Sequence, residues 1–163
     1  MEKYKEIDGD LLQLFEEGHF ENIAHGANCF NIMGAGIAGQ IKNKYPQVFY
    51  ADKYYQVCKG IERLGNLSFV EIEEVQVEAK SIGSTLKFPG VIFNLYTQNN
   101  PGPDACYDAV RLSLRKLNSW IEGETVGLPK IGCGIGGLEW DKVKVIIQEE
   151  LKDCFVTVVN YKK

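Results

Sequence analysis

The sequence is poor in the residues that build metal sites and disulfide frameworks. It has two histidines, His19 and His25, and five scattered cysteines, with no Cys-x-x-Cys pair among them. An odd number of scattered cysteines is typical of free thiols in a reducing cytosol and not of a disulfide framework or a zinc site. We therefore expect no metal, no cofactor and a cytoplasmic location.

The chain also lacks long apolar runs and an excess of positive charge. No segment approaches the roughly 20 apolar residues that cross a bilayer, and residues 1–6 carry no apolar signal-peptide core. The net charge of −4 argues against generic nucleic-acid binding, which usually needs a basic surface. We expect a monomer that has no membrane partner. Because basic side chains are not in excess, backbone N–H groups and helix ends would have to hold any anionic ligand.

What the sequence does contain is the alternation of strands and helices that an α/β domain needs. Its 163 residues, 45% of them hydrophobic, suit one globular domain spanning 1–163. Strands are predicted at 4–7, 22–28, 91–96, 125–129 and 154–159, with a strand or hairpin at 67–77. Helices are predicted at 11–17, 35–45, 47–58, 104–120 and 140–151, the first capped by Asp10 and the fourth by Asp104. Residues 79–88 fit neither pattern. The order predicts a layered sheet with helices on both faces.

Two glycine-rich turns are the most informative motifs. Residues 33–39 read Met-Gly-Ala-Gly-Ile-Ala-Gly, and residues 132–137 read Gly-Cys-Gly-Ile-Gly-Gly. Glycine lets backbone N–H groups come close to a ligand, and a helix that starts at such a turn adds a field that favours phosphate. Two turns in one small domain suggest a ligand with two phosphates, held from both sides.

Both turns follow predicted strands, as does the irregular segment 97–103. Ligands of open α/β sheets bind at the carboxyl ends of the strands. We therefore expect the three segments to converge on one crevice.

Together with their neighbours, these turns resemble the macrodomain family. The resemblance rests on His25-Gly26-Ala27-Asn28, on the first turn, and on residues 129–140, which read Pro-Lys-Ile-Gly-Cys-Gly-Ile-Gly-Gly-Leu-Glu-Trp. It covers nearly the whole chain and implies a three-layer α/β/α fold with a mixed sheet. The most similar branch consists of small stand-alone proteins that process ADP-ribose-1″-phosphate or remove ADP-ribose from carboxylate side chains.

The resemblance implies a role for each part of the site. Asp10 would accept a hydrogen bond from the adenine amino group, Asn28 would lie near the distal ribose, and Tyr161 would flank adenine. The first turn would bracket the distal ribose and its phosphate, and the second would embrace the diphosphate. The implied binding residues are Asp10, Leu11, Asn28, Met33, Gly34, Ala35, Gly36, Ile37, Ile131, Gly132, Cys133, Gly134, Ile135, Gly136 and Tyr161.

The chain departs from relatives that use a covalent lysine intermediate. Those relatives carry an Asp in the second turn and a Lys after the strand that corresponds to 93–96. Here these places hold Gly136 and the segment 98–100, Gln-Asn-Asn. Phosphatase-like relatives instead use a His near the first turn and an Asp beyond the second, which would be His25 and Asp141.

The expected function is therefore a phosphatase that converts ADP-ribose-1″-phosphate to ADP-ribose and phosphate, with His25, Asn28 and Asp141 as candidate catalytic residues. His25 can equally be a hydrogen-bonded core residue, and Asp141 suits the first turn of a helix. Cys29 and Cys133 read as buried thiols. Two alternatives remain: a hydrolase that removes ADP-ribose from modified macromolecules, and a binding protein for ADP-ribose without turnover.

Overall fold

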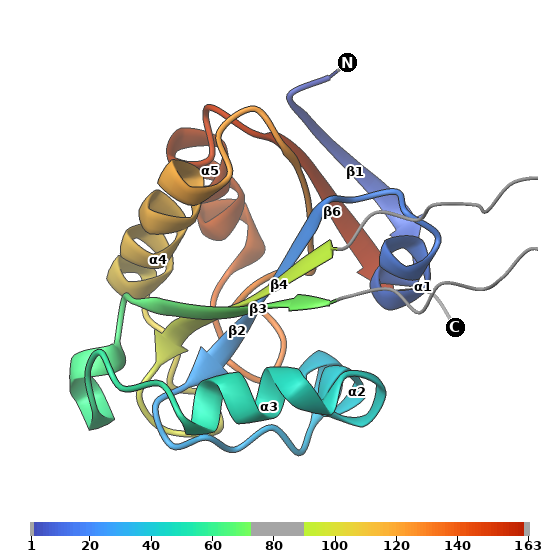
Figure 1. Cartoon of the computed structure of the whole chain (residues 1–163). Coiled ribbons are helices and arrows are strands. Elements are labelled where there is room, and N and C mark those ends of the chain that lie inside the picture. Colours follow the sequence, from blue (N-terminus) through green and yellow to red (C-terminus); the bar gives the residue numbers. More distant parts are fainter. Residues whose placement is uncertain (1, 73–89, 162–163) are drawn as a thin grey trace, which may run out of the picture.

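The computed structural model describes residues 2–72 and 90–161, which form a six-stranded sheet covered by helices (Figure 1). The strand order is β1-β6-β5-β2-β4-β3, and β3 alone runs antiparallel to its neighbour. The elements in chain order are β1 Tyr4–Gly9, α1 Leu11–Glu16, β2 Asn22–Asn28, α2 Gly36–Lys44, α3 Pro46–Lys53, the short 3₁₀ helix η1 Gly60–Arg63, β3 Leu67–Ile72, β4 Gly90–Gln98, α4 Tyr107–Trp120, β5 Thr125–Leu128, α5 Trp140–Glu150 and β6 Phe155–Tyr161. The mixed sheet of the predicted α/β/α fold is confirmed.

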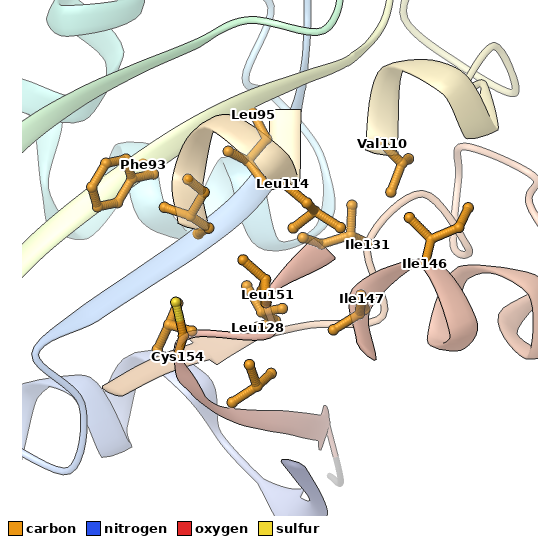
Figure 2. Close-up of a cluster of buried hydrophobic side chains, with 14 of the residues drawn as sticks. Phe93, Leu95, Val110, Leu114, Leu128, Ile131, Ile146, Ile147, Leu151 and Cys154 are labelled. Carbon is orange, nitrogen blue, oxygen red and sulfur yellow. The ribbon is translucent and has the colours of Figure 1, made fainter. Parts of the chain in front are cut away.

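Each face of the sheet has its own hydrophobic core because neighbouring residues in a strand point to opposite faces. Phe93 and Val158 pack on the side of α4 and α5, whereas Ile92 and Val159 pack on the side of α1, α2 and α3. Figure 2 shows the first of these cores, where Leu114 of α4 and Ile147 of α5 meet side chains from the strands. The helices therefore form two outer layers around the sheet (Figure 1).

Local signals place several element boundaries correctly. Asp10 is the N-cap of α1, and its carboxylate accepts a hydrogen bond from the Gln13 backbone N–H at 3.1 Å. Helix α2 ends at Lys44, and Pro46 is the first residue of α3. The predicted end of α3 is wrong, because the helix ends at Lys53, five residues earlier. None of the described helices is long and apolar enough to cross a membrane.

The predicted cap of α4 is wrong. The helix starts at Tyr107, and its N-cap is Cys106, whose sulfur accepts from the Ala109 N–H at 3.4 Å. The Asp104 carboxylate instead accepts a hydrogen bond from the Asn100 backbone N–H at 2.8 Å, which holds the preceding loop. The predicted strand positions Val75 and Val77 and the unassigned segment 79–88 lie outside the described residues.

Candidate ligand-binding site

The carboxyl ends of the parallel strands open into a cavity of about 700 Å³. Its walls come from the segments that follow β1, β2, β4 and β5 and from the last residues of β6, so the predicted convergence of the loops is confirmed. The lining residues are Asp10, Leu11, Gly26, Ala27, Asn28, Ile32, Gly34, Ala35, Gly36, Ile37, Ala38, Gln40, Thr97, Gln98, Pro101, Gly102, Pro129, Lys130, Ile131, Gly132, Cys133, Gly134, Ile135, Gly136, Val159, Asn160 and Tyr161.

The first glycine turn runs directly into a helix, as its sequence predicts. Helix α2 starts at Gly36, which has a φ of +57°, and Ala35 caps it without a side-chain hydrogen bond. The first N–H groups of an α-helix have no acceptor within the helix. Because residues 34–38 line the cavity and the first turn of α2 holds no acidic side chain, this end of the helix suits an anion.

The second glycine turn does not begin a helix. Its backbone folds back on itself, with the Leu138 N–H donating to the Gly132 carbonyl at 2.8 Å, and α5 starts only at Trp140. Gly132 has a φ of +74°, a backbone conformation that glycine adopts without strain. A Cβ atom added to Gly136 would lie 2.7 Å from the Gly132 carbonyl oxygen. This turn therefore lines the cavity with backbone that lacks the field of a helix end.

Few charged groups line the cavity. Among its described lining residues, the charged side chains are Asp10 and Lys130, and the Lys130 ammonium lies 5.4 Å from the centre of the Trp140 ring. Burial raises the pKa of the Cys133 thiol, which makes it a weak nucleophile. In the described parts of the chain, no three His, Cys, Asp or Glu side chains gather in a way that could hold a metal ion.

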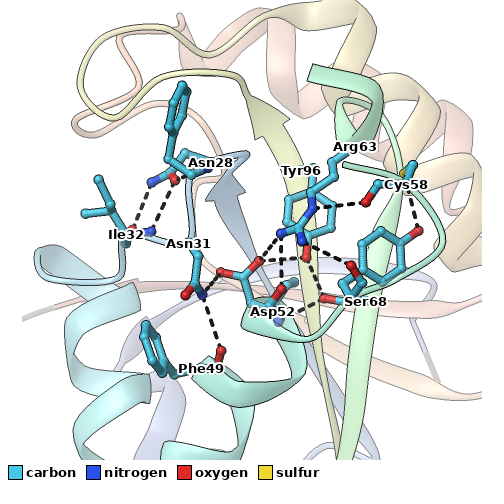
Figure 3. A network of polar contacts seen from close by, with 12 residues as sticks. Asn28, Asn31, Ile32, Phe49, Asp52, Cys58, Arg63, Ser68 and Tyr96 are labelled. Atoms are coloured by element: carbon cyan, nitrogen blue, oxygen red, sulfur yellow. Dashed lines mark hydrogen bonds and ion pairs between the residues drawn. The ribbon is translucent and has the colours of Figure 1, made fainter. Parts of the chain in front are cut away.

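Asn28 shapes the first wall of the cavity. Its amide oxygen accepts from the backbone N–H groups of Phe30 and Ile32, at 2.9 and 3.3 Å, and its amide nitrogen donates to the Ile32 carbonyl at 2.8 Å. These bonds fold residues 28–32 into a compact turn (Figure 3). Asn28 borders the cavity as predicted, but its amide is already engaged by the backbone.

A buried polar network supports this turn from behind (Figure 3). The carboxylate of Asp52, 1% exposed, accepts from the Asn31 side chain at 2.6 Å and from the Tyr96 hydroxyl at 2.7 Å, and it pairs with Arg63 at 3.2 Å. Asn31 has a φ of +57°, in the left-handed region that Asn tolerates better than most residues. The network thus joins the cavity wall to α3, η1 and β4.

His25 belongs to this network and not to the lining of the cavity. It is fully buried, and its Nε2 lies 2.5 Å from the Asn94 side-chain oxygen. The Asn94 amide nitrogen donates to the Ser68 hydroxyl, so its oxygen is the acceptor and the Nε2–H is the donor. Burial lowers the pKa of His25 below its usual value. Of the two interpretations of His25, the structure therefore agrees with a hydrogen-bonded core residue.

The buried histidine gives a testable pH dependence of stability. Because the native state holds His25 neutral, the unfolded chain binds more protons below the unfolded pKa of about 6.5. The free energy of unfolding should therefore fall as the pH drops from 7 to 5, with a contribution from His25 of at most about 1.4 kcal/mol per pH unit. We expect His25→Gln to flatten this slope in urea unfolding at pH 5, 6 and 7. An unchanged slope would show that His25 does not titrate in this way.

Two other predicted site residues also lie away from the cavity. Met33 is 2% exposed and packs in the core on the side of α1, α2 and α3. Asp141 is exposed in the first turn of α5, where a carboxylate stabilises the helix N-terminus. Of the three candidate catalytic residues, the structure brings only Asn28 to the cavity, and we assign no step to His25 or Asp141.

The structure adds cavity residues that the sequence motifs did not single out. They include Gly26 and Ala27 of β2 and Val159 and Asn160 of β6, whereas Thr97 and Gln98 belong to the segment 97–103 that was expected at the crevice. The parallel pairing of β2 with β4 and of β6 with β1 and β5 brings the carboxyl ends of these strands to the same edge of the sheet. The Asp52–Arg63 pair was missed because its two residues are 11 positions apart and no local motif links them.

Known proteins resemble this chain in sequence and in fold. The Macro domain family model matches residues 24–147. An uncharacterised 17.5 kDa protein of Enterobacteria phage T4 is 35% identical, over 96% of each chain. A DNA ADP-ribosyl glycohydrolase of Mycobacterium tuberculosis is 31% identical over 83% of this chain, but the match spans only 35% of that protein. An ADP-ribose 1″-phosphate phosphatase of Candida albicans is 26% identical, over 88% of this chain and 90% of the relative.

A solved structure extends the likeness to the three-dimensional fold. The macrodomain of Mycobacterium tuberculosis DarG superposes with a TM-score of 0.70, at 26% identity, over 100% of this chain and 99% of that one. The family model covers both glycine turns, residues 33–39 and 132–137, over their full length. The chain therefore belongs to the Macro domain family.

Proposed function

We propose that this chain binds ADP-ribose in the cavity and hydrolyses ADP-ribose-1″-phosphate to ADP-ribose and phosphate. The observation that carries the proposal is the pair of glycine turns, which line one cavity from two sides, with Lys130 as the one basic residue among the described lining residues. A diphosphate between them would receive hydrogen bonds from both walls.

The cavity is also long enough for a ligand with two different ends. Asp10 follows β1, whereas Gln98 ends β4, which lies four positions away in the sheet. Neighbouring strands are spaced by about 4.8 Å, so these walls are roughly 19 Å apart. The Asp10 carboxylate and the exposed Tyr161 ring offer an acceptor and a flat face for adenine at one end. The distal ribose would then reach the β4 end.

Two features favour phosphate release over a covalent lysine mechanism. The segment 98–100, Gln-Asn-Asn, stands where lysine-dependent relatives carry their lysine, and the Gln98 amide donates to the Asn100 and Gly102 carbonyls at 2.7 and 2.9 Å. A phosphatase of Candida albicans resembles the chain over almost its full length. In hydrolysis, water attacks phosphorus, the bond to the 1″ oxygen breaks, and that oxygen takes up a proton. The N–H groups of residues 34–36 would stabilise the charge of the phosphoryl group.

The direct test incubates the protein with ADP-ribose-1″-phosphate and measures released phosphate and ADP-ribose. We expect equal amounts of both products. ADP-ribosylated DNA serves as the second substrate. Release of ADP-ribose from DNA without phosphate release would replace the phosphatase with a glycohydrolase. Tight binding of ADP-ribose without turnover of either substrate would leave a binding protein.

Asp10 provides a test of the adenine end. Asp10→Ser keeps a side-chain oxygen for the N-cap of α1 but withdraws the acceptor from adenine. We expect the affinities for ADP-ribose and for ADP to fall about tenfold, as for the loss of a charged hydrogen bond, with little change in thermal stability. Calorimetric titration gives the affinities. An unchanged affinity would remove Asp10 from the binding site.

A further inference from the structure

One hydroxyl group in the cavity wall has no hydrogen-bond partner among the residues that the structure describes. Thr97 is fully buried, its Oγ1 atom has no hydrogen-bond partner within the described parts of the chain, and the residue lines the cavity. An unpaired buried hydroxyl costs free energy, and such groups are rare in native proteins. Valine would fill nearly the same space without this cost.

An irregularity in the sheet accounts for the position of Thr97. In the pairing of β2 with β4, Ala27 lies opposite Tyr96 and Asn28 lies opposite Gln98, so Thr97 is the extra residue of a bulge. Bulges are frequent next to active sites, where they re-aim a side chain. The backbone of Thr97 stays tied down, because its carbonyl accepts from the Cys106 N–H at 3.0 Å.

A glycine lies directly beside the hydroxyl. A Cβ added to Gly26, which also lines the cavity, would lie 2.8 Å from the Thr97 Oγ1 atom. Because Gly26 has no side chain, the space beside the hydroxyl at this point is not filled by one. The next atom near that Cβ position is the Ile131 Cγ2 atom at 3.7 Å, which is apolar and leaves the hydroxyl unpaired.

We propose that Thr97 is a ligand-binding residue whose hydroxyl forms a hydrogen bond with the part of the ligand farthest from adenine. This inference rests on the proposed function, which places adenine at Asp10. Since β4 is four strand positions from β1, Thr97 is separated from the Asp10 end by about 19 Å. The partner is therefore a hydroxyl or ester oxygen of the distal ribose, a group that ADP-ribose has and ADP lacks.

The test compares the affinities of Thr97→Val for ADP-ribose and ADP by calorimetric titration. We expect the affinity for ADP-ribose to fall about tenfold, because a ligand hydroxyl loses its partner, and the affinity for ADP to stay unchanged. The thermal midpoint should stay the same or rise, since the substitution removes an unpaired buried hydroxyl. Thr97→Ser should restore the binding of ADP-ribose, and Thr97→Ala should not.

Thr157→Val is the matched control, because Thr157 is a buried threonine of β6 that does not line the cavity. It should leave both affinities unchanged. If Thr97→Val lowers the affinities for ADP-ribose and for ADP equally and also lowers the thermal midpoint, Thr97 only supports the fold. If the wild type binds ADP-ribose and Thr97→Val binds it equally well, this inference fails alone. If the wild type does not bind ADP-ribose, the proposed function fails with it.

Discussion

Gly136→Ala should abolish most of the hydrolysis of ADP-ribose-1″-phosphate. The added methyl group would lie 2.7 Å from the Gly132 carbonyl oxygen and 2.9 Å from the Ala105 Cβ atom. Neither contact can be relieved by turning a side chain, so the second glycine turn has to move. A misplacement of about 1 Å in a binding loop can cost about 100-fold in rate, and we expect a loss of that order in the rate of phosphate release.

Gly134→Ala is the control in the same turn. A Cβ at Gly134 meets no atom within 4 Å, and its φ lies outside the left-handed region that only glycine adopts easily. It should therefore keep the shape of the turn, so that the rate of phosphate release falls much less than in Gly136→Ala. Similar activities for the two variants would contradict the role given to the close backbone approach at Gly136.

Asp52→Ala should cause the largest loss of stability. The substitution leaves the Arg63 guanidinium, 8% exposed, without its carboxylate, and it removes an acceptor from Asn31 and Tyr96. Removing one partner of a buried ion pair typically costs about 3–5 kcal/mol. Urea unfolding at pH 7 measures this loss.

Glu139→Ala controls for the general loss of a carboxylate. Glu139 pairs with Lys142 at 3.4 Å, and both side chains are well exposed. Surface substitutions of this kind change the free energy of unfolding by about 0.5 kcal/mol or less. If Asp52→Ala were equally mild, the network behind the first cavity wall would not stabilise the fold as described.

Much of the fold follows from local signals in the sequence. The strand Asn22–Asn28 has the predicted bounds because it is a short apolar run between a helix stop and a glycine turn. The Asp10 cap was predictable because the side chain and its N–H partner are three residues apart. The predicted cap at Asp104 was wrong because that prediction also used only local sequence. The Asp104 carboxylate accepts hydrogen bonds from Asn100 and holds the loop 100–104 instead of capping α4.

The parts of the site that could not be predicted depend on contacts distant in sequence. The Tyr96 hydroxyl reaches Asp52 across 44 residues, and the Asn94 oxygen reaches His25 across 69. Nothing near His25 in the sequence shows that its ring points into this network and away from the cavity lining. The glycine turns could be recognised in the sequence because only glycine fits where two backbone segments lie very close together. The bulge at Thr97 depends instead on how β2 and β4 pair, which the sequence near Thr97 does not show.

The central claim is that the two glycine turns hold ADP-ribose in one cavity. Calorimetric titration of the wild-type protein with ADP-ribose tests it most directly. We predict saturable binding of one ADP-ribose per chain, with an affinity higher than that for ADP because the distal ribose adds contacts at the β4 end. An absence of saturable binding, or equal affinities for ADP-ribose and ADP, would contradict this account of the site.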